Sequence, residues 1–284
     1  MPPQAPPPVR AGFKALESLL PSVGAQVAEG LFHQVPRPPE LAKRRRTMEP
    51  GEAFEVDLHG RRIRGEMWGS GPHVHLVHGW GGWHQQLGSH VTPLVEAGYT
   101  VLAHDALSHG ESDHGDLGAH RTSVPELALS FAAVAKAHGP VAGVVAHSAG
   151  AMAALLAVRD GLQVGRMVGI ATAVRADAML NGMQDSLGFG DRISERLVKR
   201  VEDRHQVSFG DFDLIDLAPR LDPRPPLLLV HDVDDQEMPV ADAVELADAW
   251  PNAQRLITTS GLGHYKIIWA PETVAATSDF LARD

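Results

Sequence analysis

The sequence predicts an α/β fold: a mostly parallel sheet with flanking helices, an N-terminal antiparallel hairpin and a small helical cap. Three observations support this prediction. From Gly51 onward, short β-branched runs alternate with helical patterns, which is typical of a parallel sheet covered on both faces. Two strand-like runs at the start of this region flank a tight turn. Between Thr172 and Pro225 the alternation stops, which indicates an insertion. A chain of 284 residues suits one large domain of this kind.

The first two strands form the hairpin, since "EAFEVDL" and "RRIRGEMW" are joined by the His-Gly turn at 59–60. Further strands are expected at 73–78, 99–104, 141–147, 166–171, 226–232 and 254–259. Between them, the spacing of apolar residues predicts helices at about 86–97, 123–138, 148–159, 239–250 and 271–282.

The insertion at about 173–225 has an irregular helical pattern. Its clearest helix is "DRISERLVKRVED", where Ile193, Leu197 and Val201 fall on one stripe. An insertion that follows a parallel strand lies over the carboxyl ends of the strands, where open α/β sheets bind ligands. We therefore expect a small cap over the site, within a main domain that spans residues 51–284.

Residues 1–50 are predicted to be a proline-rich helical extension. Residues 1–10 are expected to be frayed, and apolar residues then recur at helical spacing as far as Phe32, with an interruption at Pro21. A helix packed on the flank of the domain, a lid and a dimer arm all fit this pattern, so a homodimer stays open. The basic run "KRRR" at 43–46 is expected to be a solvated linker.

Composition excludes several classes of function. The formal net charge of -10 argues against nucleic acid or an anionic membrane as the main partner. The absence of cysteine excludes disulfides, thiolate catalysis and zinc-thiolate sites. The sequence has no run of 18 apolar residues, so no transmembrane helix is expected. The segment "MPPQAPPPVR" lacks the features of a signal peptide. A cytoplasmic protein that acts on a small-molecule substrate is the expectation.

The candidate nucleophile is Ser148, in "AHSAG" at 146–150. The segment lies between a buried strand and an alanine-rich helix, and its small residues permit the sharp turn that exposes a nucleophilic serine. A serine at this point is also a good helix N-cap, so the motif alone leaves both interpretations open.

A nucleophilic serine needs a base and an acid. His264, in "GLGH", follows the last predicted strand in a glycine-rich loop that can reach back over the sheet. The segment "HDVDDQEMP" at 231–239 supplies three carboxylates at the end of another strand: Asp232, Asp234 and Asp235.

An oxyanion hole needs backbone N–H groups aimed at the developing negative charge. The residue after the serine, Ala149, would give one. The loop "HGWGG" at 78–82 would give the other from Trp80, since its glycines allow close approach of the backbone. The rings of Trp80 and Trp83 either line the substrate pocket or pack in the core.

With these motifs the chain resembles the α/β-hydrolase superfamily. The resemblance rests on "HGWGG", "HDALSHGES" (104–112), "AHSAG", "HDVDDQEMP" and "GLGH", and it extends from about residue 51 to the C-terminus. The second motif departs from the family pattern at Ser108, where glycine is usual. The fourth aligns Asp235 with the family's acid, although Met238 stands where valine is common. The order serine, aspartate, histidine is also that of the family.

The resemblance implies an α/β-hydrolase fold and a serine hydrolase without a cofactor. Ser148 would attack an ester-like carbonyl (carboxylic ester, thioester or lactone), His264 would be the base, and Asp235 would orient the imidazole. A small, partly apolar substrate would bind among Trp83, His147, Met179 and Met183. Two alternatives remain: a non-catalytic binding protein that keeps the hydrolase fold, and an acyltransferase.

A metal centre is the main rival chemistry. His73, His75, His78 and His84 are close in sequence, and strand alternation puts the first two on one face. No carboxylate stands in a metal-ligand pattern with them, so we expect no catalytic metal.

Overall fold

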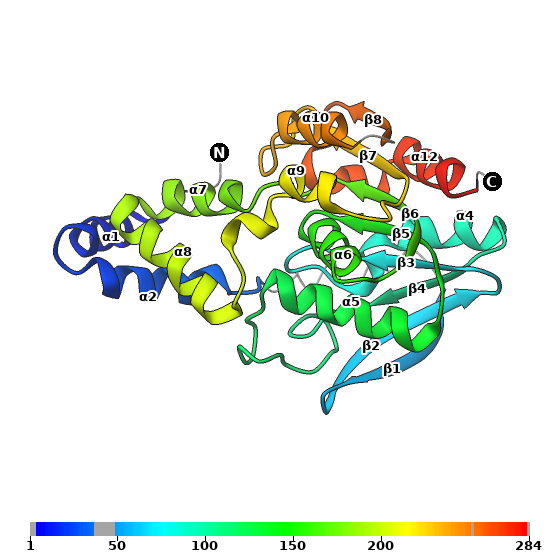
Figure 1. Ribbon diagram of the computed structural model, residues 1–284, viewed down its shortest axis with the longest axis horizontal. Coiled ribbons are helices and arrows are strands. Elements are labelled where there is room, and N and C mark those ends of the chain that lie inside the picture. Colours follow the sequence, from blue (N-terminus) through cyan, green and yellow to red (C-terminus); the bar gives the residue numbers. More distant parts are fainter. Residues whose placement is uncertain (1–3, 37–48, 251–252, 283–284) are drawn as a thin grey trace.

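The computed structural model describes residues 4–36, 49–250 and 253–282, and its body is an eight-stranded sheet between layers of helices (Figure 1). The strands follow one another across the sheet in the order β1-β2-β4-β3-β5-β6-β7-β8. Their bounds are β1 Glu52–Leu58, β2 Arg61–Gly69, β3 His73–Val77, β4 Thr100–His104, β5 Val141–His147, β6 Val164–Ile170, β7 Leu227–Asp232 and β8 Ala253–Thr259.

The sheet is mostly parallel, as the sequence predicts. The hairpin β1–β2 is antiparallel, and β2 also pairs with β4 in the antiparallel sense. Every further pair, from β4–β3 to β7–β8, is parallel. The central strand β5 reads "VAGVVAH" and is almost wholly buried, because helices cover both faces of a parallel sheet.

Alternate residues of the parallel strands point into two separate cores. On one face Val144 of β5 packs with helices α5 (Val124–His138) and α6 (Ala149–Arg159). On the other face Val145 packs with α4 (Val91–Glu96) and α12 (Pro271–Leu281). The carboxyl ends of the strands stay free of these layers, and the loops that follow the strands meet there.

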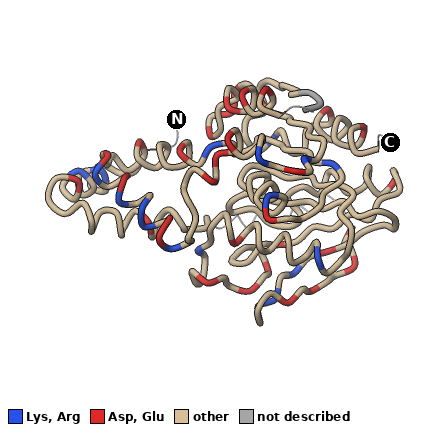
Figure 2. Tube along the Cα trace, in the orientation of Figure 1, with Lys and Arg blue, Asp and Glu red and all other residues tan. Residues whose placement is uncertain are grey.

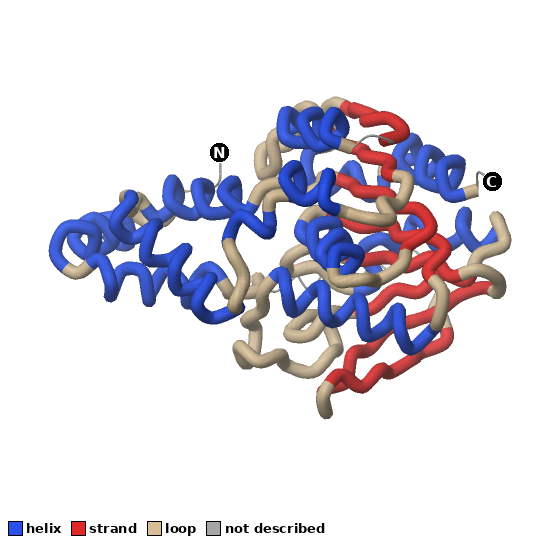
Figure 3. Tube along the Cα trace, viewed as in Figure 1, coloured by secondary structure: helices blue, strands red, loops and turns tan. Residues whose placement is uncertain are grey.

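A lobe of four helices extends away from the sheet (Figures 1 and 3). It combines α1 (Pro7–Leu19) and α2 (Pro21–Phe32) from the N-terminus with α7 (Ala176–Leu187) and α8 (Asp191–His205) from the insertion. Their shared core includes Phe13, Leu180 and Ile193. The N-terminal extension therefore packs on the inserted helices, and the two segments form one helical unit that we call the lobe.

A buried carboxylate also joins the two halves of the lobe. Glu29 of α2 is only 4% exposed, and it accepts hydrogen bonds from Nε of Arg200 at 2.6 Å and of Arg204 at 2.7 Å. Both arginines belong to α8, on which Lys and Arg are concentrated (Figure 2). A paired charge of this kind holds α2 and α8 in register, since a lone buried carboxylate would be costly.

The start of the N-terminal extension differs from the prediction. The prediction that residues 1–10 are frayed is wrong for residues 7–10, which form the first turn of α1. Proline is favoured there because its fixed φ suits the start of a helix and its missing N–H is not needed. The basic run at 43–46 lies outside the described residues.

The rest of the insertion lies against the body of the protein. After α8 the chain forms short helices, η2 (Phe209–Phe212), α9 (Leu214–Leu217) and η3 (Ala218–Arg220). Phe212, Leu214 and Leu217 belong to the same core as α5 and α6. Of the insertion, α7 and α8 thus form part of the lobe, while Phe209 of η2 packs against both the core of the lobe and that of the body.

Candidate active site

Ser148 stands on a strained turn between β5 and α6. Its backbone has φ 52° and ψ −125°, a region that residues with a Cβ rarely adopt and that costs free energy. Two glycines allow the turn to pack closely. A Cβ on Gly150 would lie 2.3 Å from the carbonyl oxygen of His78, and one on Gly79 would lie 3.0 Å from Ser148 Cβ. The turn thus holds Ser148 directly against the loop that follows β3.

His264 reaches Ser148 from the loop that follows the edge strand β8. It lies in the short helix α11 (Gly263–Lys266), which follows β8. Its Nε2 atom is 3.0 Å from Ser148 Oγ, a normal hydrogen-bond distance. Both residues are largely buried, with 7% of each exposed, so the contact is shielded from water.

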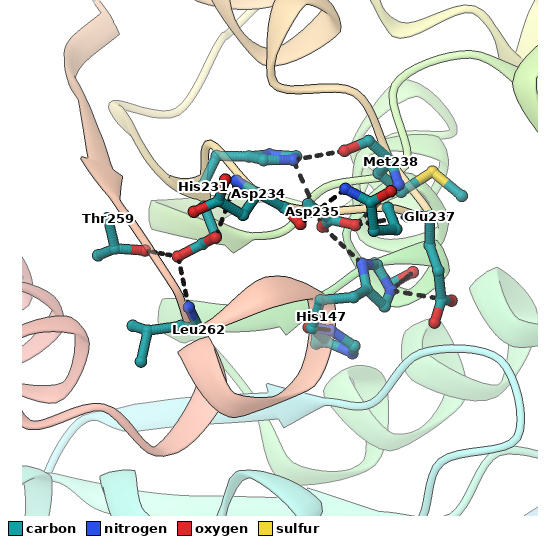
Figure 4. Close-up of polar contacts among 12 residues, drawn as sticks. His147, His231, Asp234, Asp235, Glu237, Met238, Thr259 and Leu262 are labelled. Carbon is teal, nitrogen blue, oxygen red and sulfur yellow. Dashed lines mark hydrogen bonds and ion pairs between the residues drawn. The ribbon is translucent and has the colours of Figure 1, made fainter. Parts of the chain in front are cut away.

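Asp235 lies on the far side of the His264 ring. Its Oδ2 accepts a hydrogen bond from His264 Nδ1 at 2.8 Å. Its Oδ1 accepts from the backbone N–H of Glu237 at 2.8 Å and of Met238 at 2.9 Å (Figure 4). Burial alone would raise the pKa of Asp235, but the hydrogen bond and charge of His264 and these backbone N–H groups outweigh it and lower the pKa. Asp235 therefore stays ionised beside His264.

The two neighbouring aspartates hold the loop that carries His264. Asp232 Oδ2 accepts from Thr259 Oγ1 at 2.7 Å and from the backbone N–H of Leu262 at 3.1 Å (Figure 4). Asp234 Oδ2 accepts from the backbone N–H of Gly261 at 2.8 Å. Of the three carboxylates after β7, Asp235 is the one that meets the histidine ring.

His147 and His231 hold the two loops that carry His264 and Asp235. His147 is 1% exposed, its Nε2 donates to the backbone carbonyl of His264 at 3.0 Å, and burial lowers its pKa to about 3. His231 Nε2 donates to the carbonyl of Met238 at 3.0 Å and lies 3.5 Å from Asp235 Oδ2. Both rings are therefore neutral donors that fix the loops around the His264–Asp235 pair.

The loop after β3 is fixed by His78. Its Nδ1 donates to the carbonyl of Gly79 at 2.7 Å, and its Nε2 accepts the backbone N–H of Ala106 at 3.1 Å. Since an N–H can only donate, Nε2 is the unprotonated nitrogen. Trp80 follows, with its indole N–H bonded to the carbonyl of Gln34 at 2.9 Å. Ala149 is the first residue of α6, so helix geometry gives its N–H no partner within the helix.

Comparison with known proteins identifies the family. The sequence profile of the alpha/beta hydrolase family matches residues 76–277, which is most of the chain. The chain belongs to the alpha/beta hydrolase family. No curated protein sequence matches this hydrolase.

Three solved structures illustrate the similarity of fold. A predicted CIB-like hydrolase from Thermoplasma acidophilum is 20% identical with a TM-score of 0.58, over 81% of this chain and 97% of that one. A thermophilic esterase from Thermogutta terrifontis is 16% identical with a TM-score of 0.60, over 81% and 97%. The thioesterase domain from the curacin biosynthetic pathway is 19% identical with a TM-score of 0.59, over 83% and 100%. At these identities the likeness is one of fold.

The residues predicted to bind substrate lie in different surroundings. Met179 lines a cavity between the lobe and the body, and the ring of Trp80 also lines it. Met183 packs against the core of the lobe. Trp83 precedes the helix η1 (His84–His90). His147 binds the backbone carbonyl of His264 through its Nε2. A substrate-binding role for each of these four residues, Met179 included, stays a prediction.

Two residues beside His264 were not found from the sequence. Glu237 Oε2 lies 3.8 Å from His264 Nε2, and it accepts a hydrogen bond from the hydroxyl of Tyr265 at 3.3 Å. Burial and the charge of Glu237 raise the pKa of Tyr265 to about 12, so the phenol stays protonated. Their positions next to Asp235 and His264 in the chain were the only sequence signal.

Within the described ranges, no group of three or more histidine, aspartate or glutamate side chains could hold a metal ion. No helix in the same part of the chain has the length and apolar character needed to cross a membrane.

Proposed function

We propose that this hydrolase is a serine esterase that cleaves an ester-like bond of a small, partly apolar substrate through an acyl-enzyme. The observation that carries the proposal is the continuous hydrogen-bonded line from Asp235 through His264 to Ser148, with distances of 2.8 and 3.0 Å. A serine, a neutral imidazole and an ionised carboxylate in this order form the arrangement that activates a hydroxyl for attack on a carbonyl.

The first half-reaction forms the acyl-enzyme. Because His264 Nδ1 donates to Asp235, the lone pair of Nε2 faces Ser148 Oγ and takes its proton as the hydroxyl attacks. Ionised Asp235 stabilises the imidazolium that results. The negative charge on the substrate oxygen develops beside the N–H groups of Trp80 and Ala149, which act as the oxyanion hole. The first half-reaction ends when the imidazolium gives its proton to the leaving group and the tetrahedral intermediate collapses to the acyl ester of Ser148.

The second half-reaction releases the acid. A water molecule then gives a proton to His264 Nε2 and attacks this ester, and Ser148 recovers its proton when the second tetrahedral intermediate collapses. The carboxylic ester is the preferred substrate class, and thioesters and lactones share the same chemistry at the carbonyl.

The test is to compare the wild type with Ser148→Ala on p-nitrophenyl esters of increasing acyl length. The substitution removes the attacking oxygen and is expected to lower kcat by about 10⁴–10⁶ while leaving the melting temperature nearly unchanged. Activity of the variant within about tenfold of wild type would contradict a role for Ser148 as nucleophile. Product analysis with added alcohols distinguishes hydrolysis from acyl transfer.

A further inference from the structure

An exposed carboxylate lies next to the proton-accepting atom of His264. Glu237 Oε2 is 3.8 Å from His264 Nε2, a distance at which charged groups interact although no hydrogen bond forms (Figure 4). The Glu237 side chain is exposed, whereas Ser148 and His264 are largely buried. Glu237 therefore lies at the boundary between the buried reacting groups and the solvent.

The charge of Glu237 is not balanced by a neighbouring cation. Its Oε2 accepts a hydrogen bond from the hydroxyl of Tyr265 at 3.3 Å. Burial and the charge of Glu237 raise the pKa of Tyr265 to about 12, so this partner is uncharged. Among the residues that the structure describes, no lysine or arginine forms an ion pair with Glu237, and that includes Lys266, which follows Tyr265 in the chain. A substrate thus meets a negative potential at this point.

The ring of Tyr265 also favours a cation. Tyr265 is exposed, and its ring is perpendicular to that of His264, with 5.0 Å between the ring centroids. Because its hydroxyl donates to Glu237, the ring and the carboxylate are direct neighbours. The face of an aromatic ring attracts cations, and aromatic rings recognise quaternary ammonium ligands in this way. A carboxylate and an exposed ring beside the base therefore suit an ammonium group.

The chemistry of the first half-reaction decides which part of a substrate meets Glu237. Ser148 Oγ bonds to the carbonyl carbon, and His264 Nε2 then gives its proton to the oxygen of the departing alcohol. That oxygen must come within about 2.6–3.2 Å of Nε2 for the transfer. Glu237 Oε2 is the other neighbour of the same nitrogen, at 3.8 Å. The alcohol portion of an ester is thus the portion that lies beside Glu237.

We propose that Glu237 and Tyr265 select esters whose alcohol portion carries a cationic ammonium group. The inference rests on the proposed function and names the charge of its substrate. A spacer of two carbons places the ammonium group against the Tyr265 ring and beside Glu237, because the ester oxygen and the carboxylate are both neighbours of His264 Nε2. An anionic group in the same place meets a like charge. The free cationic alcohol makes the same contacts after the reaction.

The kinetic test uses three esters of one acyl group, the one that wild type hydrolyses fastest as its p-nitrophenyl ester. Their alcohols are 2-(trimethylammonio)ethanol, which is cationic, 3,3-dimethylbutanol, which has nearly the same shape without the charge, and 2-sulfoethanol, which is anionic. We expect wild type to prefer the cationic ester over the neutral one by about threefold to tenfold in kcat/KM, as for one exposed ion pair with a ring contact. The anionic ester is expected to be the poorest of the three.

Two substitutions of Glu237 change this preference in different directions. Glu237→Gln keeps the shape and an acceptor for Tyr265 but loses the charge, so the cationic-to-neutral ratio is expected to fall to about twofold or less. In Glu237→Lys the anionic ester is expected to become the best of the three. The ratio between esters is the readout, because a substitution that only disturbs His264 lowers all three rates by the same factor.

The matched control for net charge is Glu52→Gln. Glu52 is exposed and begins the edge strand β1, which is four strands away from β5 in the sheet. At about 4.8 Å per strand this separation exceeds the screening length of about 8 Å at physiological ionic strength. The preference for the cationic ester should therefore survive in Glu52→Gln. If Glu52→Gln changed the ratio as much as Glu237→Gln, the preference would come from the overall charge of the protein and the proposal would be wrong.

A binding measurement separates this proposal from the catalytic one. It uses Ser148→Ala labelled with ¹⁵N-histidine, in which the resonance of His264 Nε2 reports an occupied site. We expect 2-(trimethylammonio)ethanol to bind at least about threefold more tightly than 3,3-dimethylbutanol, and this difference to disappear when Glu237→Gln is added. Equal kcat/KM for the three esters in wild type, together with equal binding of the two alcohols, would overturn the proposal and leave the role of Ser148 intact. If Ser148→Ala kept its esterase activity but still bound the cationic alcohol more tightly, the cation site would stand and the proposed mechanism would fall.

Discussion

In the part of the chain that the structure describes, two largely buried aspartate–histidine pairs are joined by a hydrogen bond to ring Nδ1 at the carboxyl ends of strands, and they differ in what the second ring nitrogen meets. In one pair Asp235 binds His264 Nδ1 at 2.8 Å, and His264 Nε2 faces the hydroxyl of Ser148 at 3.0 Å. In the other, Asp105 binds His84 Nδ1 at 3.0 Å, and His84 Nε2 lies 3.5 Å from Glu66 Oε2.

The second partner gives each histidine a different chemistry. His84 lies between two carboxylates, whose hydrogen bond and charges raise its pKa even though burial alone would lower it. A protonated ring in that position cannot accept a further proton. His264 has the buried carboxylate of Asp235 on one side and the Ser148 hydroxyl at 3.0 Å on the other, where the carboxylate of Glu237 is farther away at 3.8 Å and half exposed. Its Nε2 can therefore accept the proton of Ser148. The partner of ring Nε2 thus decides the role of an aspartate–histidine pair: a carboxylate there makes the pair a structural ion pair, and a hydroxyl makes the histidine a candidate base.

Among substitutions in the two pairs, Asp235→Asn is predicted to have the largest effect on activity. The amide oxygen can keep the hydrogen bonds from Glu237 and Met238, but the amide nitrogen would face His264 Nδ1 and favour the wrong tautomer. We expect kcat to fall by about 10³–10⁴ while the free energy of unfolding changes little. Kinetics and urea denaturation of the same preparation check both halves of the prediction.

Asp234→Asn is the control for that change. Asp234 is one residue away, and its Oδ2 binds the backbone N–H of Gly261 but does not bind His264. Its substitution is expected to cost less than about tenfold in kcat. If Asp234→Asn or Asp232→Asn abolished activity and Asp235→Asn did not, the acid would be misassigned.

Asp105→Asn, the equivalent substitution in the His84 pair, is expected to lower stability and to change kcat little. Asp105 is 1% exposed and accepts hydrogen bonds from the His84 ring, the His84 backbone and the Glu111 backbone. Asp105→Asn removes the nearer of the two carboxylates that flank the His84 ring, and breaking a buried ion pair typically costs up to about 3–5 kcal/mol of stability. Urea denaturation is expected to show this loss, while kcat of the folded fraction stays within about tenfold of wild type. A large loss of kcat with unchanged stability would remove the distinction between the pairs.

The pH dependence of stability sharpens the comparison. Because the folded protein raises the pKa of His84, its ion pair contributes fully below the unfolded value of about 6.5. That contribution disappears as the pH rises through the higher pKa of the folded state. The difference in unfolding free energy between wild type and His84→Gln should therefore be larger at pH 6 than at pH 9. An equal difference at both pH values would mean that His84 is not charged in the folded protein.

The smallest predicted effect concerns Glu237. Its carboxylate is 3.8 Å from His264 Nε2, but its side chain is 47% exposed, so water screens the interaction. Glu237→Gln is expected to lower kcat/KM by about twofold to fivefold, in line with an exposed ion pair worth up to about 1 kcal/mol. A loss as large as that of Asp235→Asn would give Glu237 a direct role in catalysis.

Local patterns predicted the body of the fold well. The strand expected at 141–147 is β5 with the same bounds, and the helix expected at 123–138 is α5, which begins one residue later. These elements could be predicted because a buried β-branched run or a helical stripe of apolar residues is contained in a short stretch of sequence. The lobe could not be predicted in this way. Phe13 and Ile193 share one core although 180 residues separate them, and the apolar stripes of α1 and α8 do not specify which helix covers them.

The residues of the candidate site also differ in how well local sequence predicted them. Ser148 and His264 stood out because each follows a strand in a recognisable motif, and the structure brings them within hydrogen-bonding distance. The motif alignment separated Asp235 from Asp232 and Asp234, which local sequence could not do.

The most direct test of the central claim is to find which residue reacts with a fluorophosphonate, because it needs no knowledge of the natural substrate. Such a probe reacts with a serine oxygen only where a base removes the proton and an oxyanion hole accepts the charge. Peptide mass spectrometry of the labelled wild type is expected to place the adduct on Ser148, with labelling abolished in Ser148→Ala and strongly slowed in Asp235→Asn. Unlabelled Ser148 in folded wild type, or equal labelling of Asp235→Asn and wild type, would contradict the account.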